Sequence, residues 1–308
     1  MNGTVIKTTG KHYTVKIDNS EIVQCRLKGK FRTAGIKSTS PIVVGDKVEL
    51  EQESELWMIV KLKERKNHIL RKSVNLSKQT HIIAANIDQA ILMITLDSPV
   101  TTTGFIDRFL VAANACGVDV ILLFNKTDLL KDKLKLEQEN LQKVYEKIGY
   151  KCFSFSVIND DLSSIKNLMT GKVNMISGHS GVGKSTLINK LQPNLNINTK
   201  EVSNTHKQGQ HTTTFSELHE LDFGASIIDT PGIRGFGLVA LELNRIGNYF
   251  PEFYALKEDC KFHNCIHKNE PNCAVKIGLE KGEITQSRYK NYLNMLVEEE
   301  NHFRTNDY

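Results

Sequence analysis

The chain has 308 residues, of which 40% are hydrophobic and 24% charged, with a formal net charge of +5. These values are typical of a globular chain with two or three domains and exclude a disordered or fibrous protein. No apolar run reaches the roughly 18 residues that a membrane-spanning helix needs. Residues 1–10 lack the charged-then-apolar pattern of a signal peptide, so we expect a cytoplasmic protein without a membrane partner.

Residues 1–70 are predicted to form a small β-barrel. Short runs of alternating apolar side chains, each bounded by turn residues, occur at 13–17, 23–27, 43–50 and 57–59. About five strands at this spacing favour the oligonucleotide-binding type of barrel, the OB-fold. Residues 1–72 hold fifteen Lys and Arg against eight Asp and Glu. This basic excess favours a polyanion such as RNA as a partner, and a merely solvated basic surface is the alternative.

Four basic residues alternate within this first region: Arg26, Lys28, Lys30 and Arg32. Alternation places them on one face of a strand pair. Such a face is either a ridge that follows phosphates or a solvated edge that discourages aggregation, and the sequence does not separate the two.

Residues 74–238 alternate between buried strands and amphipathic helices, which predicts a parallel α/β sheet. The expected strands lie at 89–96, 118–124 and 150–156, and the expected helices at 105–116 and 141–148. A polar, lysine-rich stretch within residues 65–85 is interpreted as a linker between the two regions.

A glycine-rich segment follows a short apolar strand at 173–177 and precedes a predicted helix at 185–191. It reads Gly178-His179-Ser180-Gly181-Val182-Gly183-Lys184-Ser185-Thr186 and matches the phosphate-loop pattern G-x-x-x-x-G-K-S. Glycines let the backbone curl so that its amides point at a phosphate. Lys184 would add charge near the β- and γ-phosphates, and Ser185 would ligate Mg²⁺. The alternative is a glycine-rich turn without a ligand.

A second motif, Asn125-Lys126-Thr127-Asp128, comes directly after the predicted strand at 118–124. N-K-x-D at a strand end is the guanine-reading motif of GTPases. The Asp128 carboxylate can accept from the ring N–H and the amine of guanine, a donor pair that adenine lacks. The Lys126 stem can lie against the base, whereas a helix-capping turn is the alternative reading. Ser154 to Ser156, at the next strand end, are weaker candidates for contacting the guanine carbonyl.

Two further segments are expected to respond to the γ-phosphate. The polar stretch 199–215 contains Thr213, one of three threonines that could complete the Mg²⁺ shell or else only begin a strand. Asp229-Thr230-Pro231-Gly232 reads D-x-x-G, which places Asp229 near Mg²⁺ and the Gly232 amide near the γ-phosphate.

Residue 233 is Ile, where Ras-like GTPases have the Gln that orients the attacking water. Because Ile cannot orient water, another group must do so or intrinsic hydrolysis must be slow. His211, on the 199–215 stretch, is our candidate for this role, with Lys184 as a second catalytic residue. An exposed loop histidine without a function is the alternative.

Residues 239–308 form a third region, expected to be mainly helical. Cys260, Cys265, His267 and Cys273 lie within fourteen residues and supply the ligands of a closed tetrahedral zinc site, with His263 as a rival ligand. We expect one structural ion, because about seventy residues with few apolar groups need such a constraint.

The motif order is unusual, because the guanine motif at 125–128 precedes the phosphate loop at 178–185. The central domain is therefore expected to be a circularly permuted P-loop GTPase domain. The sequence resembles the ribosome small-subunit-dependent GTPase A family of bacteria over nearly its whole length. The resemblance rests on residues 25–30, 85–89, 106–108, 125–128, 178–186, 211–214, 229–232 and the four Cys and His positions between 260 and 273.

This resemblance implies three domains: an OB-fold at 1–70, a permuted GTPase domain at 74–238 and a zinc-binding domain at 239–308. It implies GTP and GDP with Mg²⁺ as ligands, and the small ribosomal subunit and its ribosomal RNA as partners. It also implies a role in late maturation of that subunit, with hydrolysis of GTP stimulated by it. We expect the protein to be a monomer.

Two other readings differ in class. An RNA-binding switch, gated by bound GTP and with incidental hydrolysis, is the first. A kinase-like enzyme acting on a small molecule is the second, but no additional substrate pocket is legible in the sequence.

Overall fold

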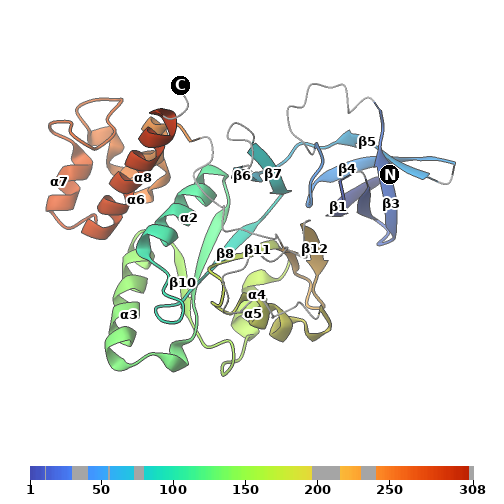
Figure 1. Ribbon diagram of the computed structural model, residues 1–308, viewed down its shortest axis with the longest axis horizontal. Helices are drawn as coiled ribbons and strands as arrows, with labels where there is room; N and C mark the ends of the chain where they lie inside the picture. Colours follow the sequence, from blue (N-terminus) through green and yellow to red (C-terminus); the bar gives the residue numbers. More distant parts are fainter. Residues whose placement is uncertain are drawn as a thin grey trace.

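The computed structural model describes residues 1–10, 12–29, 41–54, 56–72, 80–195, 216–229 and 241–304. Figure 1 shows the barrel and the C-terminal helices at opposite ends of the molecule, with the central α/β sheet between them.

The N-terminal region forms a closed five-stranded barrel. Its strands are β1 (Asn2–Thr8), β2 (Tyr13–Ile17), β3 (Ile22–Leu27), β4 (Lys47–Glu53) and β5 (Leu56–Leu62). They are ordered β1-β2-β3-β5-β4, and β1 also pairs with β4, which closes the barrel. Alternate side chains such as Val15, Val23 and Ile59 fill the interior. The predicted barrel is confirmed, although the sequence patterns had not located β1.

The stretch interpreted as a linker contains a strand pair, so that interpretation is wrong. β6 (His68–Lys72) pairs antiparallel with β7 (Thr80–Ala85) in a small separate sheet. Ile69 and Ala84 are fully buried against the central core. The lysines around residues 72–78 masked this pattern, because they raise the polarity of a window in which the apolar runs of both strands are short.

The central region is a six-stranded sheet in the order β10-β9-β8-β11-β13-β12. The strands are β8 (Gln89–Ile94), β9 (Asp119–Phe124), β10 (Lys151–Ser154), β11 (Val173–Ser177), β12 (Glu217–Glu220) and β13 (Ser226–Asp229). All neighbouring pairs are parallel except β12–β13, which is antiparallel. The predicted parallel α/β sheet is confirmed.

Helices cover both faces of this sheet. They are α2 (Thr103–Ala115), α3 (Asp132–Lys147), α4 (Ser163–Met169) and α5 (Lys184–Leu191), with 3₁₀ turns η1 (Thr127–Leu129) and η2 (Pro193–Leu195). Leu92 of β8 packs in one core with residues of α2 and α3, whereas Met93 packs in a second core with α4 and α5. This explains the continuous apolar run of β8, because both faces of the strand are buried.

The C-terminal region is mainly helical over the described residues 241–304, apart from a loop at 260–273. It contains η4 (Leu243–Tyr249), α6 (Pro251–Leu256), η5 (Lys257–Asp259), α7 (Ala274–Glu280) and α8 (Gln286–Arg304). Phe250, Phe253 and Tyr292 centre its core, which also includes Val111 of α2. None of the helices within the described ranges is long and apolar enough to cross a membrane.

The barrel is joined to the central sheet through its first strand. β1 pairs antiparallel with β12, with Lys7 opposite Glu217, so that one continuous eleven-stranded sheet runs through both regions. The barrel also meets the central region at a second junction, where Gly45 has φ +88° and a Cβ added to it would lie 2.0 Å from the carbonyl oxygen of Ala85. The backbones of the two regions therefore approach more closely than any side chain allows.

We predict that Gly45→Ala destabilises this junction by at least about 2 kcal/mol, because both the left-handed backbone and the clash with Ala85 oppose the new Cβ. The check is urea unfolding followed by fluorescence of Trp57, the single tryptophan, which lies in the barrel. Gly10→Ala is the matched control, since Gly10 has φ +80° with nothing within 4 Å of an added Cβ. Equal losses in the two variants would show that the close approach is unimportant.

Candidate nucleotide and metal sites

The loops that carry the nucleotide motifs meet at one edge of the central sheet. The guanine motif (residues 125–128) follows β9, the phosphate loop (residues 178–185) follows β11, and residues 95–102 follow β8. β8 is hydrogen-bonded to both β9 and β11 in parallel. The carboxyl ends of parallel strands share an edge, which is where open α/β sheets bind their ligands.

Asn125 connects the guanine motif to the phosphate loop directly. Its side chain is buried, and Nδ2 donates to the carbonyl of Val182 at 2.7 Å. Its Oδ1 accepts from the backbone N–H of Val157 at 3.0 Å. A Cβ added to Gly183 would lie 2.5 Å from Asn125 Nδ2, so a glycine is required there. The structure thus brings together two motifs whose first residues, 125 and 178, are 53 positions apart in the sequence.

The phosphate loop has the backbone that its glycines predict. Gly178, Gly181 and Gly183 have φ values of +145°, +83° and +104°. A Cβ on Gly178 would lie 2.6 Å from the carbonyl of Met93, which again excludes a side chain. Lys184 begins α5 and extends its ammonium over the loop, where Nζ donates to the carbonyls of Gly178 and His179 at 2.8 and 2.7 Å. A helix start, curled amides and an ammonium at one place favour an anionic ligand.

The remaining guanine-motif residues lie beside the same edge. Lys126 has φ +65°, and its Nζ donates to the carbonyl of Ser98 at 2.5 Å. Thr127 and Asp128 begin the η1 turn, and the Asp128 side chain is exposed. The backbone N–H of Ser156, the weaker candidate, donates to Asp160 Oδ2 at 2.6 Å. A direct contact of that amide with guanine is therefore not favoured.

Sequence reasoning missed the segment from 95 to 105 that supports both motifs. Ser98 accepts from Lys126, and Pro99 lies 3.6 Å from a Cβ added to Gly181. The Phe105 ring packs on the His179 ring, with centroids 4.0 Å apart. Only the position of this segment, at the carboxyl end of a buried strand, could have indicated it from the sequence.

The candidate magnesium ligands are only partly described. Ser185 is half-buried in the first turn of α5, Thr186 next to it is exposed, and Asp229 is the last residue of β13. The β-strand register places Asp229 opposite Glu217 of β12. His211, Thr213 and Gly232 lie outside the described residues, so their predicted roles stay predictions.

The four expected metal ligands converge in the C-terminal region. One ligand atom each from Cys260, Cys265, His267 and Cys273 lies within 4.8 Å of all the others. His267 directs Nδ1 at the cluster, 3.6 Å from Cys260 Sγ and 3.4 Å from Cys273 Sγ. The rival ligand His263 is exposed and outside this cluster. Three thiols and one imidazole in this arrangement can hold a metal ion.

Without a bound cation, burial favours the neutral forms of the thiols and of the imidazole in this cluster. Burial raises the pKa of the Cys265 thiol to about 12 and raises that of Cys273. Burial lowers the pKa of His267, which keeps the imidazole neutral as a ligand must be. A bound divalent cation would reverse the preference of the thiols and take them as thiolates.

The loop that carries these ligands is fixed by side chains that sequence reasoning missed. The Glu270 carboxylate accepts from the backbone N–H groups of Ile266, Lys268 and Asn269 at 2.8, 2.9 and 3.0 Å. The hydroxyl of Tyr289 donates to the carbonyl of His267 at 2.8 Å, and that of Tyr292 donates to the carbonyl of Ile266. The ligand loop is therefore pre-ordered, as metal sites with good outer partners are.

One part of the basic ridge on the barrel is described. Lys28 Nζ forms ion pairs with Glu51 and Glu53 of β4, at 3.1 and 2.8 Å. These carboxylates would compete with a phosphate for the Lys28 ammonium, which favours the interpretation of this residue as part of a solvated edge. Lys30 and Arg32 lie outside the described residues.

Comparison with protein families and solved structures agrees with this architecture. A family model described as RsgA GTPase matches residues 62–239, and one described as RsgA N-terminal domain matches residues 2–56. The structure of YjeQ from Thermotoga maritima superposes with a TM-score of 0.78 at 33% identity, covering 96% of this chain and 97% of that one. The structure of YloQ, titled a circularly permuted GTPase, gives 0.75 at 30%, covering 96% and 94%.

Two curated relatives carry the name small ribosomal subunit biogenesis GTPase RsgA. The one from Flavobacterium johnsoniae is 56% identical over 313 residues, covering 100% of this chain and 96% of the relative. The one from Bacteroides fragilis strain YCH46 is 48% identical over 303 residues, covering 97% of each. Fold and likeness together define a circularly permuted GTPase, a GTP hydrolase. The chain belongs to the RsgA GTPase family.

We predict that Glu270→Ala accelerates release of a bound metal about tenfold, the lower range for loss of an outer partner of a metal site. The reason is that three backbone N–H groups of the ligand loop lose their common acceptor. The check is transfer of metal from the purified chain to a colorimetric chelator. Glu280→Ala, an exposed carboxylate on α7, is the control, and equal rates in both variants would contradict the pre-ordering argument.

Proposed function

We propose that this GTPase binds the small ribosomal subunit, assists its late maturation and hydrolyses GTP with stimulation by that subunit. The observation that carries the proposal is the Asn125 junction, which holds a guanine motif against a phosphate loop. It stands in a chain whose relatives, matched along nearly their full length, are named for small-subunit biogenesis.

The nucleotide is proposed to lie across the edge of the central sheet. Asp128 would accept from guanine, with Lys126 and Thr127 shaping the base site beside Asn125. The backbone amides from Gly178 to Gly183, together with Lys184, would hold the β- and γ-phosphates. Thr186, in the first turn of α5, would also contact the nucleotide. Support comes from the shared edge and from the positive φ values of the loop glycines. Mg²⁺, when bound, would neutralise phosphate charge.

Magnesium would be held by Ser185 and Thr213 directly and by Asp229 through water, with the Gly232 amide near the γ-phosphate. For hydrolysis, His211 is the proposed water-positioning group, because Ile233 cannot orient water. Lys184 would stabilise the charge that develops on the transferred phosphoryl group. These roles rest on the motifs, since several of the residues lie outside the described ranges.

Ribosomal RNA is the proposed ligand of the two flanking regions. The chain would divide into an RNA-binding barrel at 1–70, the GTPase domain at 74–238 and a metal-binding domain at 239–308. The barrel topology and the basic excess of residues 1–72 support RNA binding. Because ribosomal subunits mature in the cytoplasm, the protein would act there. We propose that it acts as a monomer.

Zinc is the proposed occupant of the C-terminal cluster. Three thiolates and one imidazole leave no open position for substrate, so the ion would be structural. The buried, pre-ordered ligand loop supports this assignment. When bound, the ion would join the segment around Cys260 to the turn before α7, which begins right after Cys273.

We predict that purified chain hydrolyses GTP slowly alone and about 10²-fold or more faster with small ribosomal subunits, since catalytic groups supplied on complex formation contribute factors of about 10³–10⁵ in other GTPases. Large subunits serve as the control, and phosphate release is the measurement. His211→Ala is expected to lose the stimulation. Stimulation kept in that variant would move the catalytic group elsewhere, and stimulation by neither subunit would favour the RNA-binding switch.

A second prediction addresses nucleotide choice. Asp128→Asn should weaken GTP binding about a hundredfold and favour xanthosine triphosphate, because the amide can donate to the xanthine carbonyl that replaces the guanine amine. Competition between the two nucleotides for the purified chain measures this. Asp132→Asn, an exposed carboxylate at the start of α3, is the matched control. An unchanged preference in Asp128→Asn would remove Asp128 from the base site.

A further inference from the structure

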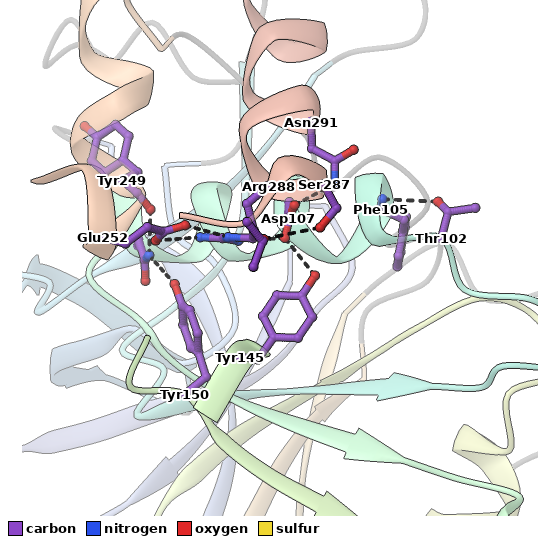
Figure 2. A network of polar contacts seen from close by, with 12 residues as sticks. Thr102, Phe105, Asp107, Tyr145, Tyr150, Tyr249, Glu252, Ser287, Arg288 and Asn291 are labelled. Atoms are coloured by element: carbon purple, nitrogen blue, oxygen red, sulfur yellow. Dashed lines mark hydrogen bonds and ion pairs between the residues drawn. The ribbon is translucent and has the colours of Figure 1, made fainter. Parts of the chain in front are cut away.

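A group of buried charges lies outside the nucleotide and metal sites, where α2 of the central domain meets α8 (Figure 2). Asp107, on α2, is fully buried. Its Oδ1 accepts from Arg288 Nη1 at 2.6 Å and from the Tyr145 hydroxyl at 2.8 Å, and its Oδ2 accepts from Asn291 Nδ2 at 2.6 Å. One carboxylate therefore has donors from both α3 and α8.

Arg288 is the centre of this network. Its side chain is 3% exposed, and its Nε and Nη2 donate to the two oxygens of Glu252 on α6, at 2.7 and 2.9 Å. The guanidinium carbon lies 4.6 Å from the centroid of the Phe250 ring. Burial disfavours the charged form, but Asp107 and Glu252 raise the pKa of Arg288 above its usual value. One permanent cation thus joins α2, α6 and α8.

Stability alone does not explain such a network. Replacing a buried ion pair by apolar residues is often neutral or stabilising, whereas removing one partner is strongly destabilising. Burial also raises the pKa of Asp107, and the donors Arg288, Asn291 and Tyr145 oppose that rise. What three directional partners do provide is a fixed position for the Asp107 side chain and hence for the first turns of α2.

The opposite side of α2 contacts the nucleotide loops. Phe105 precedes Asp107 by two residues, which at 3.6 residues per turn places the two on roughly opposite sides of the helix. The Phe105 ring packs on His179 of the phosphate loop, at 4.0 Å between centroids. The hydroxyl oxygen of Thr102 caps α2 by accepting from the Phe105 N–H. Thr102 is also the last residue of the segment 95–102, in which the carbonyl of Ser98 accepts from Lys126. The first turn of α2 lies between α8 and the nucleotide site.

We propose that Arg288, a residue of the C-terminal region, is a positioning residue for the nucleotide site. Through Asp107 it fixes the start of α2, and the segment from 95 to 105 then supports the phosphate loop at His179 and the guanine motif at Lys126. The inference rests on the proposed nucleotide-binding role of these two motifs. Its consequence is that the C-terminal region and the nucleotide stabilise each other, since coupling between two sites is reciprocal.

The test is the dissociation constant of a fluorescent N-methylanthraniloyl-GDP for the full chain, measured well below the unfolding temperature. Arg288→Lys keeps the charge but cannot bridge both carboxylates with a planar fork. We expect its dissociation constant to rise about tenfold, within the 5- to 150-fold range of coupling between sites. Phe105→Ala removes the contact of α2 with His179 and should raise the dissociation constant by a similar factor. The double variant should then lose less than the product of the two single effects.

Leu296→Ala is the matched control for general destabilisation. Leu296 lies on α8, is 1% exposed and packs in the C-terminal core, but no hydrogen bond to Asp107 involves it. It should lower the melting temperature about as much as Arg288→Lys and leave the dissociation constant within about twofold, because sites without shared partners are nearly additive. An equal rise in Leu296→Ala would reduce Arg288 to ordinary structural support and overturn the proposal.

A second measurement covers the case in which Arg288→Lys does not fold. Hydrogen exchange of the wild-type chain should show slower exchange in α8 when N-methylanthraniloyl-GDP is added, and Phe105→Ala should abolish that slowing at saturating nucleotide. Unchanged exchange in α8 overturns the proposal. If the wild-type chain does not bind the nucleotide at all, the proposed function fails instead, so the two failures are distinguishable.

Discussion

The carboxamide of Asn125 holds the guanine motif and the phosphate loop at a fixed separation. It uses both of its polar atoms, donating to Val182 and accepting from Val157, and it is buried while doing so. A buried amide that lost either partner would be left unsatisfied, at a cost of about 1–3 kcal/mol. The two loops therefore cannot separate without a penalty. A ligand that spans both meets a distance that is already set, which lowers the entropic cost of binding.

The pairing of the central strands explains why the order of the motifs along the chain is unimportant. β8 pairs in parallel with β9 on one side and β11 on the other, and each strand delivers its following loop to the same edge. What the site needs is this neighbour relation in the sheet. A chain that enters the sheet at β8 and one that enters at β11 produce the same edge, provided that the helices still cover both faces.

Residues with local signals were predictable, and residues whose role is a tertiary contact were not. The glycines of the phosphate loop and the buried run of β8 are recognisable because each is dictated by its own backbone or burial. By contrast, β6 and β7 are short and flanked by lysines, so their pairing is visible only in space.

The supporting residues escaped prediction for a related reason. Phe105 matters because His179, 74 positions later in the chain, packs on it, and Glu270 matters because three amides converge on it. No periodicity or motif records such contacts. The roles of His211 and Thr213 stay predictions, because both residues lie outside the described ranges.

Each flanking region has an attachment to the central domain at the carboxyl edge of the sheet, where the nucleotide motifs lie. Because β12 runs antiparallel to β13, its first residue, Glu217, lies opposite Asp229 at the carboxyl end of β13. Lys7 of the barrel pairs with Glu217 on its other side and forms an ion pair with it at 2.8 Å. The exposed ion pair contributes little energy, but the backbone pairing fixes the register.

The C-terminal region attaches at the same level through the first turns of α2 and the buried charge of Arg288. One attachment is a β-ladder next to Asp229, and the other is an ionic network next to the support of the phosphate loop. If a nucleotide binds at this edge as proposed, a displacement of the strand β13 or of the phosphate loop would act on the region attached next to it. Such an arrangement would let a change at the sheet edge reach both flanking regions without their touching the nucleotide.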